Sequence, residues 1–269
     1  MAAIRYKGIF LFLILVLACF AGLRWWSPRE TAPEAAPTVP ELAVASACEQ
    51  IRFEGTQFTA CRYEPRRHAL ELMLGDERGP FRNFAELEQH LGDRTASLRF
   101  AMNAGMFDEA GAPIGLYVED GRQRRALNRR AGGGNFHLAP NGVFLVEPNG
   151  KPQVLTSDAY ARRKAAPRWA TQSGPMLVID GALHPAFQPN GTSLYIRNGV
   201  GVDDAGTAWF ALSEEPVSFG RFARFFRDRL GTPNALYLDG SVSSLWDRPA
   251  GRQDAFPALG PMVAVFERE

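Results

Sequence analysis

The N-terminal segment is the feature that most limits how this chain can fold. Arg5 and Lys7 precede an uninterrupted apolar run from Gly8 to Leu23, and Arg24 and two tryptophans follow it. A positive start followed by such a run is typical of an export signal. A buried core helix is a poor alternative, because the run lies at the extreme N-terminus and nothing polar interrupts it. The run is short for a membrane span, but interfacial tryptophans extend its reach.

The boundaries of the folded domain follow from this segment. We predict that residues 1–26 form an uncleaved signal anchor with its basic end in the cytoplasm, and a cleaved signal peptide stays open as the alternative. Residues 27–47 alternate proline with alanine, glutamate and threonine, a composition typical of an extended linker. The folded domain is therefore expected at 48–269. It would lie in the cell envelope and face the periplasm, anchored to the inner membrane or secreted.

The composition excludes one class of partner. The formal net charge is +1, whereas a nucleic-acid surface needs a basic excess. We therefore expect no nucleic-acid partner. Hydrophobic residues make up 46% of the chain and charged residues 22%, which is ordinary for a protein with a packed core.

The pattern of apolar residues predicts an α+β domain. Phe84–Leu91 and Phe219–Leu230 have apolar residues at helical spacing. Short apolar or alternating runs between glycine turns predict strands: two short ones around Gly55, then 69–74, 98–102, 116–119, 142–146, 175–179, 207–212 and 235–238. We expect a single domain with a mixed or antiparallel β-sheet core and a few helices.

Two cysteines flank the first expected hairpin. Cys48 and Cys61 can pair across it if the domain lies in an oxidising compartment, and two unlinked buried thiols are the alternative. No Cys-x-x-Cys spacing and no paired-histidine spacing occurs. We therefore predict no metal site and no cofactor, and leave a divalent cation open.

Polar residues follow strands at several glycine-rich turns, where a rigid sheet often holds functional groups. Asn103 ends one strand before Gly105, and Asp239 ends another before Gly240. Asp239 could act as an acid, a base or a cation ligand. The structural alternative is that each side chain only closes its turn.

Three further segments contain candidate ligands. Arg197 precedes a glycine-rich strand and could bind an oxyanion through its fork. The loop Gly132–Gly134 lacks the Lys-Ser/Thr of a phosphate-binding loop, so a mobile loop is its simpler interpretation. The candidate substrate-binding residues comprise Arg197, Gly240, Ser243, Ser244, Thr171, Gln172, Ser173, Asn135 and His137.

Four segments together resemble the phosphodiester glycosidase family, and in particular its exported bacterial branch. They are an Asn-x-Gly-x-Phe turn at 103–107, a Gly-Pro-x-Leu strand at 174–181, an Arg followed by a glycine-rich strand at 197–202, and a Leu-Asp-Gly strand end at 238–244. The branch also has paired cysteines near Cys48 and Cys61. Ser241 departs from the pattern, because many members have a second glycine there.

The resemblance implies hydrolysis of a glycosyl phosphodiester between the anomeric carbon and a phosphate oxygen. Asp239 would stabilise positive charge at that carbon, Asn103 and Ser243 would orient the sugar, and Arg197 would bind the departing phosphate. The expected partners are a carbohydrate phosphodiester of the envelope or exopolysaccharide and, through the N-terminal segment, the membrane. Two alternatives remain: a non-catalytic glycan-binding or envelope-assembly protein, and a phosphodiesterase that cleaves the P–O bond.

Overall fold

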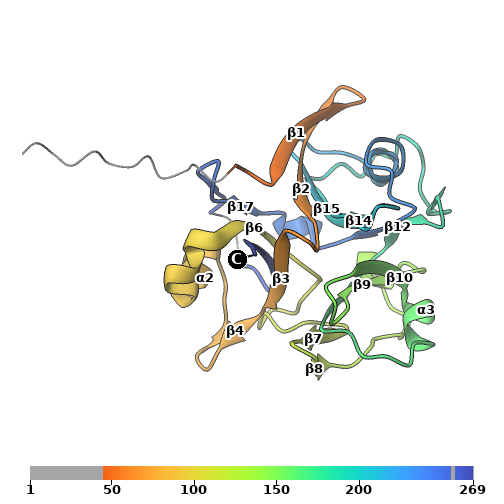
Figure 1. Cartoon of the computed structure of the whole chain (residues 1–269). Coiled ribbons are helices and arrows are strands. Elements are labelled where there is room, and N and C mark those ends of the chain that lie inside the picture. Colours follow the sequence, from red (N-terminus) through yellow and green to blue (C-terminus); the bar gives the residue numbers. More distant parts are fainter. Residues whose placement is uncertain (1–44, 256–257, 269) are drawn as a thin grey trace, which may run out of the picture. The chain divides into compact units, whose positions relative to one another are not determined.

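Three antiparallel sheets form the framework of the molecule (Figure 1). The structure is a computed structural model, and it describes residues 45–255 and 258–268. No helix within those ranges is long and apolar enough to cross a membrane. The apolar run 8–23, which carries the anchor prediction, and most of the linker lie outside the described residues.

The largest sheet has seven strands and contains the strand that ends at Asp239. In spatial order the strands are β1 (Cys48–Phe53), β2 (Thr56–Tyr63), β15 (Ala208–Ser213), β14 (Asn198–Val202), β16 (Asn234–Tyr237), β12 (Met176–Ile179) and β13 (Ala182–Leu183). Cys48 pairs directly with Cys61 in the register of β1 and β2, and a disulfide joins them. The predicted cysteine pair is therefore present.

Two five-stranded sheets and a short hairpin complete the framework. One sheet runs β10 (Pro152–Thr156), β9 (Gly142–Val146), β11 (Trp169–Ser173), β7 (Tyr117–Glu119) and β8 (Arg122–Arg125). The other runs β18 (Arg252–Gln253), β17 (Leu245–Asp247), β6 (Leu98–Asn103), β19 (Met262–Glu267) and β3 (His68–Met73). The hairpin is β4 (Gly75–Asp76) with β5 (Gly79–Pro80). All the strand pairs of the described residues are antiparallel, so the predicted α+β fold class is confirmed.

The helices are short and begin at side-chain caps. They are α2 (Phe84–Leu91), α3 (Ser157–Ala161) and α4 (Phe219–Arg224), with short helical turns η1 (Gly92–Ser97), η2 (Asn135–His137), η3 (Phe225–Arg229) and η4 (Gly240–Val242). The Asn83 side chain accepts a hydrogen bond from the Glu86 amide at 2.9 Å at the start of α2, and the Glu86 carboxylate accepts from the Arg82 amide and from Asn83 Nδ2. The expected helix 219–230 is α-helical only to Arg224.

The continuation of α4 is the π-helical turn η3. Its wider spacing places both Phe225 and Phe226 in the core. The Phe225 ring stacks on Phe58 of β2 with the ring centroids 4.0 Å apart. This helix therefore covers one face of the seven-stranded sheet, a packing that favours the wide turn over a regular helix.

The three sheets share one hydrophobic core. Phe100 of β6, Phe144 of β9 and Phe210 of β15 are buried in it. The ring centroid of Phe210 lies 5.7 Å from that of Phe100 and 5.3 Å from that of Phe144. Because each sheet contributes a ring to the same contact, the ends of their strands are held in fixed positions.

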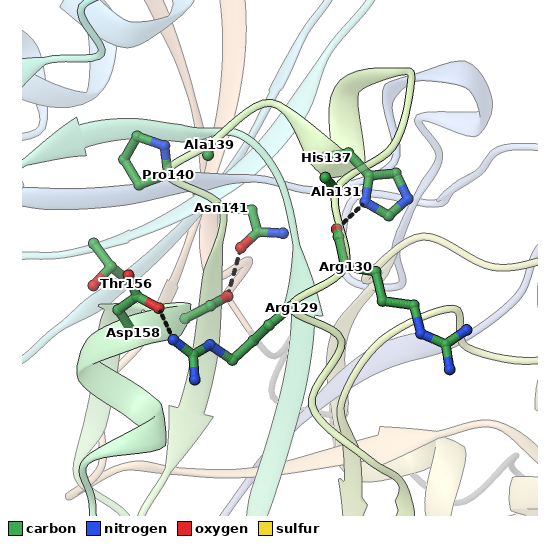
Figure 2. A pocket seen from close by; sticks show the side chains of 10 residues that line it. Arg129, Arg130, Ala131, His137, Ala139, Pro140, Asn141, Thr156 and Asp158 are labelled. Atoms are coloured by element: carbon green, nitrogen blue, oxygen red, sulfur yellow. Dashed lines mark hydrogen bonds and ion pairs between the residues drawn. The ribbon is translucent and has the colours of Figure 1, made fainter.

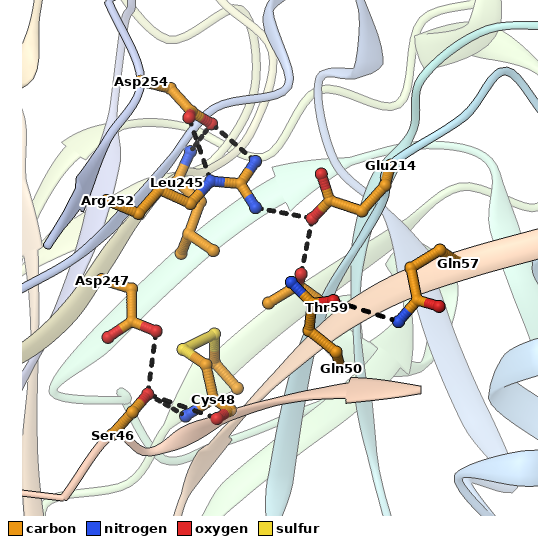
Figure 3. A network of polar contacts seen from close by, with 11 residues as sticks. Ser46, Cys48, Gln50, Gln57, Thr59, Glu214, Leu245, Asp247, Arg252 and Asp254 are labelled. Carbon is orange, nitrogen blue, oxygen red and sulfur yellow. Dashed lines mark hydrogen bonds and ion pairs between the residues drawn. A yellow bond between two sulfur atoms is a disulfide. The ribbon is translucent and has the colours of Figure 1, made fainter. Parts of the chain in front are cut away.

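A polar network joins the first hairpin to β17 and β18 (Figure 3). Arg252 donates to Asp254 through two nitrogens, each at 3.0 Å, and to Glu214 at 2.5 Å. Asp254 in turn accepts from the Leu245 amide at 2.9 Å. Burial lowers the pKa of Arg252, but its two carboxylate partners outweigh that effect and raise the pKa. The network therefore fixes the chain directly after Ser244.

Candidate active site

Asp239 emerges at the end of β16, where the chain leaves the seven-stranded sheet. Its side chain is only 8% exposed. Oδ1 accepts from the Ser241 hydroxyl at 2.6 Å and from the Ser241 amide at 3.2 Å, which caps the turn η4. Oδ2 has no hydrogen bond to any described residue. One oxygen is thus used to hold the turn, and the other remains available to a ligand.

The environment of Asp239 favours its protonated form. Burial raises the pKa of the carboxyl, and the two bonds from Ser241 oppose that rise. A carboxyl with a raised pKa can donate or accept a proton closer to neutral pH than an exposed one. Asp239 thus combines the predicted turn-capping role with the properties of a reactive group.

Asn103 at the end of β6 holds the two ends of the Asp239 loop together. Its Nδ2 donates to the Asp239 carbonyl at 2.8 Å. Its Oδ1 accepts from the Ser244 amide at 2.9 Å and from Asn198 Nδ2 at 3.0 Å. Asn103 is 1% exposed, so its amide is occupied within the protein. Its position indicates that it orients the Asp239 loop.

Asn198 is a member of this cluster that the sequence did not single out. It begins β14 and is fully buried. Its Nδ2 also donates to the Asn103 carbonyl at 2.9 Å, and its own carbonyl accepts from the Leu238 amide at 3.1 Å. The residue stands directly after Arg197 in the glycine-rich segment. Its position there was the available signal, but only the pairing of β14 with β16 reveals its partners.

Gly240 is required because Tyr237 fills the space beside it. A Cβ atom at position 240 would lie 1.8 Å from the Tyr237 hydroxyl oxygen. Tyr237 is 3% exposed, and burial raises its pKa to about 12, against the opposing effect of Arg197. The tyrosine side chain therefore sets the path of the chain after Asp239.

Ser243 and Ser244 complete the loop in different ways. The Ser243 hydroxyl is partly exposed and donates to the carbonyls of Ile196 and Gly240, both at 3.3 Å. Ser244 is buried, and its hydroxyl donates to the Val242 carbonyl at 2.9 Å. Of the two, Ser243 is the one whose hydroxyl can reach a ligand.

Arg197 lies beside this loop but is buried. It is 1% exposed, and its guanidinium carbon lies 3.6 Å from the Phe219 ring centroid. Nε donates to the Val217 carbonyl at 2.8 Å and Nη2 to the Ser193 carbonyl at 2.9 Å. Burial lowers its pKa, and no carboxylate among the described residues forms an ion pair with it. The fork expected to bind phosphate is occupied by carbonyls in this conformation, and phosphate binding by Arg197 stays a prediction.

Thr171, Gln172 and Ser173 lie on β11, and the structure separates their roles. All three are buried. Gln172 Oε1 accepts from the amides of Leu116 and Asn128, both at 2.9 Å. A Cβ at Gly105 would lie 2.4 Å from Thr171 Oγ1, so the turn after Asn103 packs directly on β11. The side chain of Gln172 therefore holds the backbone at Leu116 and Asn128 in place. The hydroxyl of Ser173 has no hydrogen-bond partner among the described residues.

Asn135 and His137 belong to the turn η2, and His137 faces a second region of the surface (Figure 2). His137 lines a cavity of about 330 Å³ together with Arg129, Arg130 and Asn141. His137 Nδ1 lies 2.9 Å from the Arg130 carbonyl, to which it donates. Asn135 is exposed. None of the hydrogen bonds made by His137 or Asn135 among the described residues joins them to the Asp239 loop.

Known proteins with the same pattern identify the family. The profile of the family described as phosphodiester glycosidase matches residues 96–260. That range exceeds half of the chain and includes Asn103, Arg197 and the whole Asp239 loop. The chain belongs to the phosphodiester glycosidase family. The resemblance inferred from the four sequence segments is confirmed.

One bacterial protein is similar in sequence to this phosphodiester glycosidase family member. The uncharacterized protein YigE of Escherichia coli is 42% identical over 149 residues, which are 55% of this chain and 58% of YigE. The match thus spans little more than half the length of that relative.

Solved structures of low sequence identity share the fold. The catalytic domain of zebrafish N-acetylglucosamine-1-phosphodiester alpha-N-acetylglucosaminidase, auto-inhibited by its pro-peptide, is 14% identical, with a TM-score of 0.55 and 82% of each chain covered. A Burkholderia pseudomallei protein described as exported is 13% identical, with a TM-score of 0.53 and coverage of 78% of this chain and 74% of the other.

Proposed function

We propose that this chain hydrolyses glycosyl phosphodiesters of the bacterial envelope or exopolysaccharide. Water supplies a hydroxyl group to the anomeric carbon and a proton to the phosphate. The bond between the anomeric carbon and the phosphate oxygen breaks, leaving a free sugar and a phosphate monoester. The developing positive charge at the anomeric carbon requires a nearby carboxylate.

The observation that carries this proposal is the state of Asp239. Its Oδ1 is held by Ser241, and its Oδ2 makes no hydrogen bond to a described residue. Asn103 bonds both the Asp239 carbonyl and the Ser244 amide. A carboxylate held in this way is positioned before substrate arrives, and positioned charge is a large source of catalytic rate.

The remaining roles follow from position. Ser243 offers a hydroxyl to the sugar, and Arg197 supplies positive charge beside the loop for the departing phosphate. We propose no resident cofactor and leave a cation requirement to measurement: turnover in excess EDTA equal to turnover without it supports that view, and loss restored by added Mg²⁺ or Ca²⁺ contradicts it.

The proposed site is exposed to an oxidising compartment. The Cys48–Cys61 disulfide and the export-type N-terminus both support this location, as does the description of the Burkholderia neighbour as exported. The substrate would then be a polymer or precursor outside the cytoplasm.

The bond that breaks can be measured directly. The full-length protein is incubated with a panel of sugar-1-phosphodiesters in ¹⁸O-labelled water, and the phosphate monoester is analysed by mass spectrometry. Cleavage at the anomeric carbon leaves that product without label. Label in the phosphate indicates P–O cleavage and supports the phosphodiesterase alternative. Binding without turnover across the panel supports the glycan-binding alternative.

Replacement of Asp239 by Asn separates chemistry from turn capping. Asn keeps an oxygen that can accept both bonds from Ser241 but loses the charge. We expect a rate loss of about a hundredfold or more. Asp108→Asn is the matched control, because Asp108 Oδ1 also accepts two amide bonds, from Ala110 and Ala112 at 3.1 and 3.0 Å. Wild-type rates in Asp239→Asn would contradict the assignment.

A further inference from the structure

Three consecutive apolar side chains stand on the surface beside the candidate site. Leu194, Tyr195 and Ile196 are 55%, 59% and 41% exposed, and they are the exposed large apolar residues of the described ranges. Single exposed apolar residues are ordinary, but a contiguous set marks a surface that binds something. We call these three residues the apolar strip.

The apolar strip is held rigidly. The Tyr195 amide donates to the Val217 carbonyl at 3.2 Å, and the Val217 amide donates to the Tyr195 carbonyl at 2.8 Å. Arg197 bonds the carbonyl of Ser193, which directly precedes the strip, and that of Val217, which pairs with Tyr195. The buried Arg197 thus fixes the backbone on which the three apolar side chains are exposed.

The strip is continuous with the Asp239 loop. The Ile196 carbonyl accepts a hydrogen bond from the Ser243 hydroxyl at 3.3 Å. Asn198, two residues further along, belongs to the cluster that holds Asp239. Three residues of extended chain span about 10 Å, enough to contact several methylene groups of one ligand that also reaches the loop.

The chemistry of the surroundings selects an apolar ligand. Between Phe187 and Val202 the one charged side chain is Arg197, and it is buried. The strip's own segment therefore adds no exposed charge that could bind a second sugar or phosphate, and the guanidinium of Arg224 that contacts this segment bonds the Pro189 carbonyl and Glu54. It is also too small for a stable protein interface, which needs roughly 1,000 Å² or more.

We propose that the apolar strip binds a lipid-like aglycone, so that the substrate is a sugar phosphodiester whose phosphate bears an apolar chain. This inference rests on the proposed function. The sugar and phosphate lie at the Asp239 loop, and the apolar chain lies along Leu194–Ile196. Hydrolysis then releases a free sugar and an alkyl phosphate monoester.

Two esters that differ only in the aglycone test the proposal. The full-length protein in phospholipid nanodiscs is given the methyl and the decyl phosphodiester of the same sugar, the latter below its micelle concentration. We expect kcat/KM to favour the decyl ester by about tenfold or more. Leu194→Ser and Ile196→Ser should each reduce that ratio severalfold, whereas Thr192→Ser, an exposed change in the same loop, should preserve it.

The outcomes separate the two proposals. Equal kcat/KM for the two esters overturns the proposal of a lipid-like aglycone and leaves the proposed hydrolysis intact. In that case the strip has another occupant, such as a second copy, the membrane or the N-terminal segment. If neither ester is cleaved, the proposed function fails. Calorimetry with decyl phosphate and methyl phosphate then tests, without any turnover, whether the strip binds an apolar chain. Tighter binding of decyl phosphate that Leu194→Ser abolishes supports it, and equal binding of both compounds overturns it.

Discussion

At the residue scale, Asp239 combines two demands that normally conflict. Its Oδ1 caps the turn through Ser241, while its burial disfavours the charge that the proposed reaction needs. A native protein tolerates such a group at a functional site because the surrounding contacts hold it there. The conflict has consequences for stability and for the pH dependence of the reaction.

The stability consequence concerns Asp239→Asn. Burial raises the pKa of this carboxyl in the folded state, so the folded chain binds the proton more tightly than the unfolded chain. That contribution is fully present below an unfolded pKa of about 4 and is lost as the pH rises through the folded pKa. We expect Asp239→Asn to melt at a higher temperature than wild type near neutral pH. The difference should shrink as the pH falls toward about 4, and a lower melting temperature at neutral pH would contradict the burial argument.

The kinetic consequence concerns Ser241. Its hydroxyl and amide both lower the pKa of Asp239 against the effect of burial. Ser241→Ala removes the 2.6 Å hydroxyl bond and keeps the amide, so the pKa of Asp239 should rise. The limb of the kcat/KM profile that reports Asp239 should move to higher pH, and Ser241→Thr should restore it. An unmoved profile with unchanged melting would show that Ser241 does not influence the reacting group.

At the element scale, the site exists because the ends of β6, β14 and β16 meet. Asn103 ends β6 in one sheet, and Asn198 begins β14 beside β16 in another. The hydrogen bonds of the two asparagines therefore join two sheets at the Asp239 loop. The loop's position depends on both sheets together.

Removal of the Asn103 amide tests this junction. Asn103→Ala leaves the buried Ser244 amide without a partner and the Asp239 carbonyl with only the Val242 amide at 3.4 Å. We expect the free energy of unfolding to fall by about 3 kcal/mol, since each unsatisfied buried group costs roughly 1–3 kcal/mol, and kcat to fall with it. Denaturant titration measures the loss. Asn149→Ala removes one exposed turn bond and serves as the control, with an expected change within about 0.5 kcal/mol.

The first hairpin gives a second prediction at this scale. The Cys48–Cys61 disulfide closes a loop with a sequence separation of 13 residues. Because a crosslink restricts the unfolded chain, Cys48→Ser with Cys61→Ser should lower the free energy of unfolding by about 2–3 kcal/mol. Urea titration of the double variant against oxidised wild type provides the measurement. If both thiols of unreduced, exported protein react with a labelling reagent, the crosslink does not form in the cell.

At the scale of the whole molecule, the disulfide of the folded domain agrees with the predicted export, because disulfides form in oxidising compartments outside the cytoplasm. The positive residues before the apolar run predict that the domain crosses the membrane. A reporter that is active only outside the cytoplasm, fused after the last residue, should be active. A full-length fusion that accumulates without reporter activity would overturn the export prediction, and Arg5→Glu with Lys7→Glu should reduce export because the positive start directs it.

The sequence by itself determined the features that depend on neighbouring residues. The pattern of apolar positions identified helix α2 and the strands β3, β6, β7, β9, β12, β15 and β16, and the glycine turn predicted the β1–β2 hairpin with its cysteines. It did not identify several other strands, among them β10, β11, β17 and β19. The order of four short segments identified the family. The sequence also marked Asn103 and Asp239 as polar residues at strand ends, because an apolar run followed by a polar residue and a glycine is a local signal.

Only the tertiary structure decided what those residues contact. Burial of Arg197 against Phe219, the clamp of Asn103 on Asp239 and Ser244, and the role of Asn198 all depend on pairing between segments distant in sequence. Likewise, the π-helical turn after α4 follows from the fit of Phe225 on Phe58. Periodicity reports which face of an element is buried, but hydrogen-bond partners and ring contacts are set by the register and packing of the three sheets, which no single segment encodes.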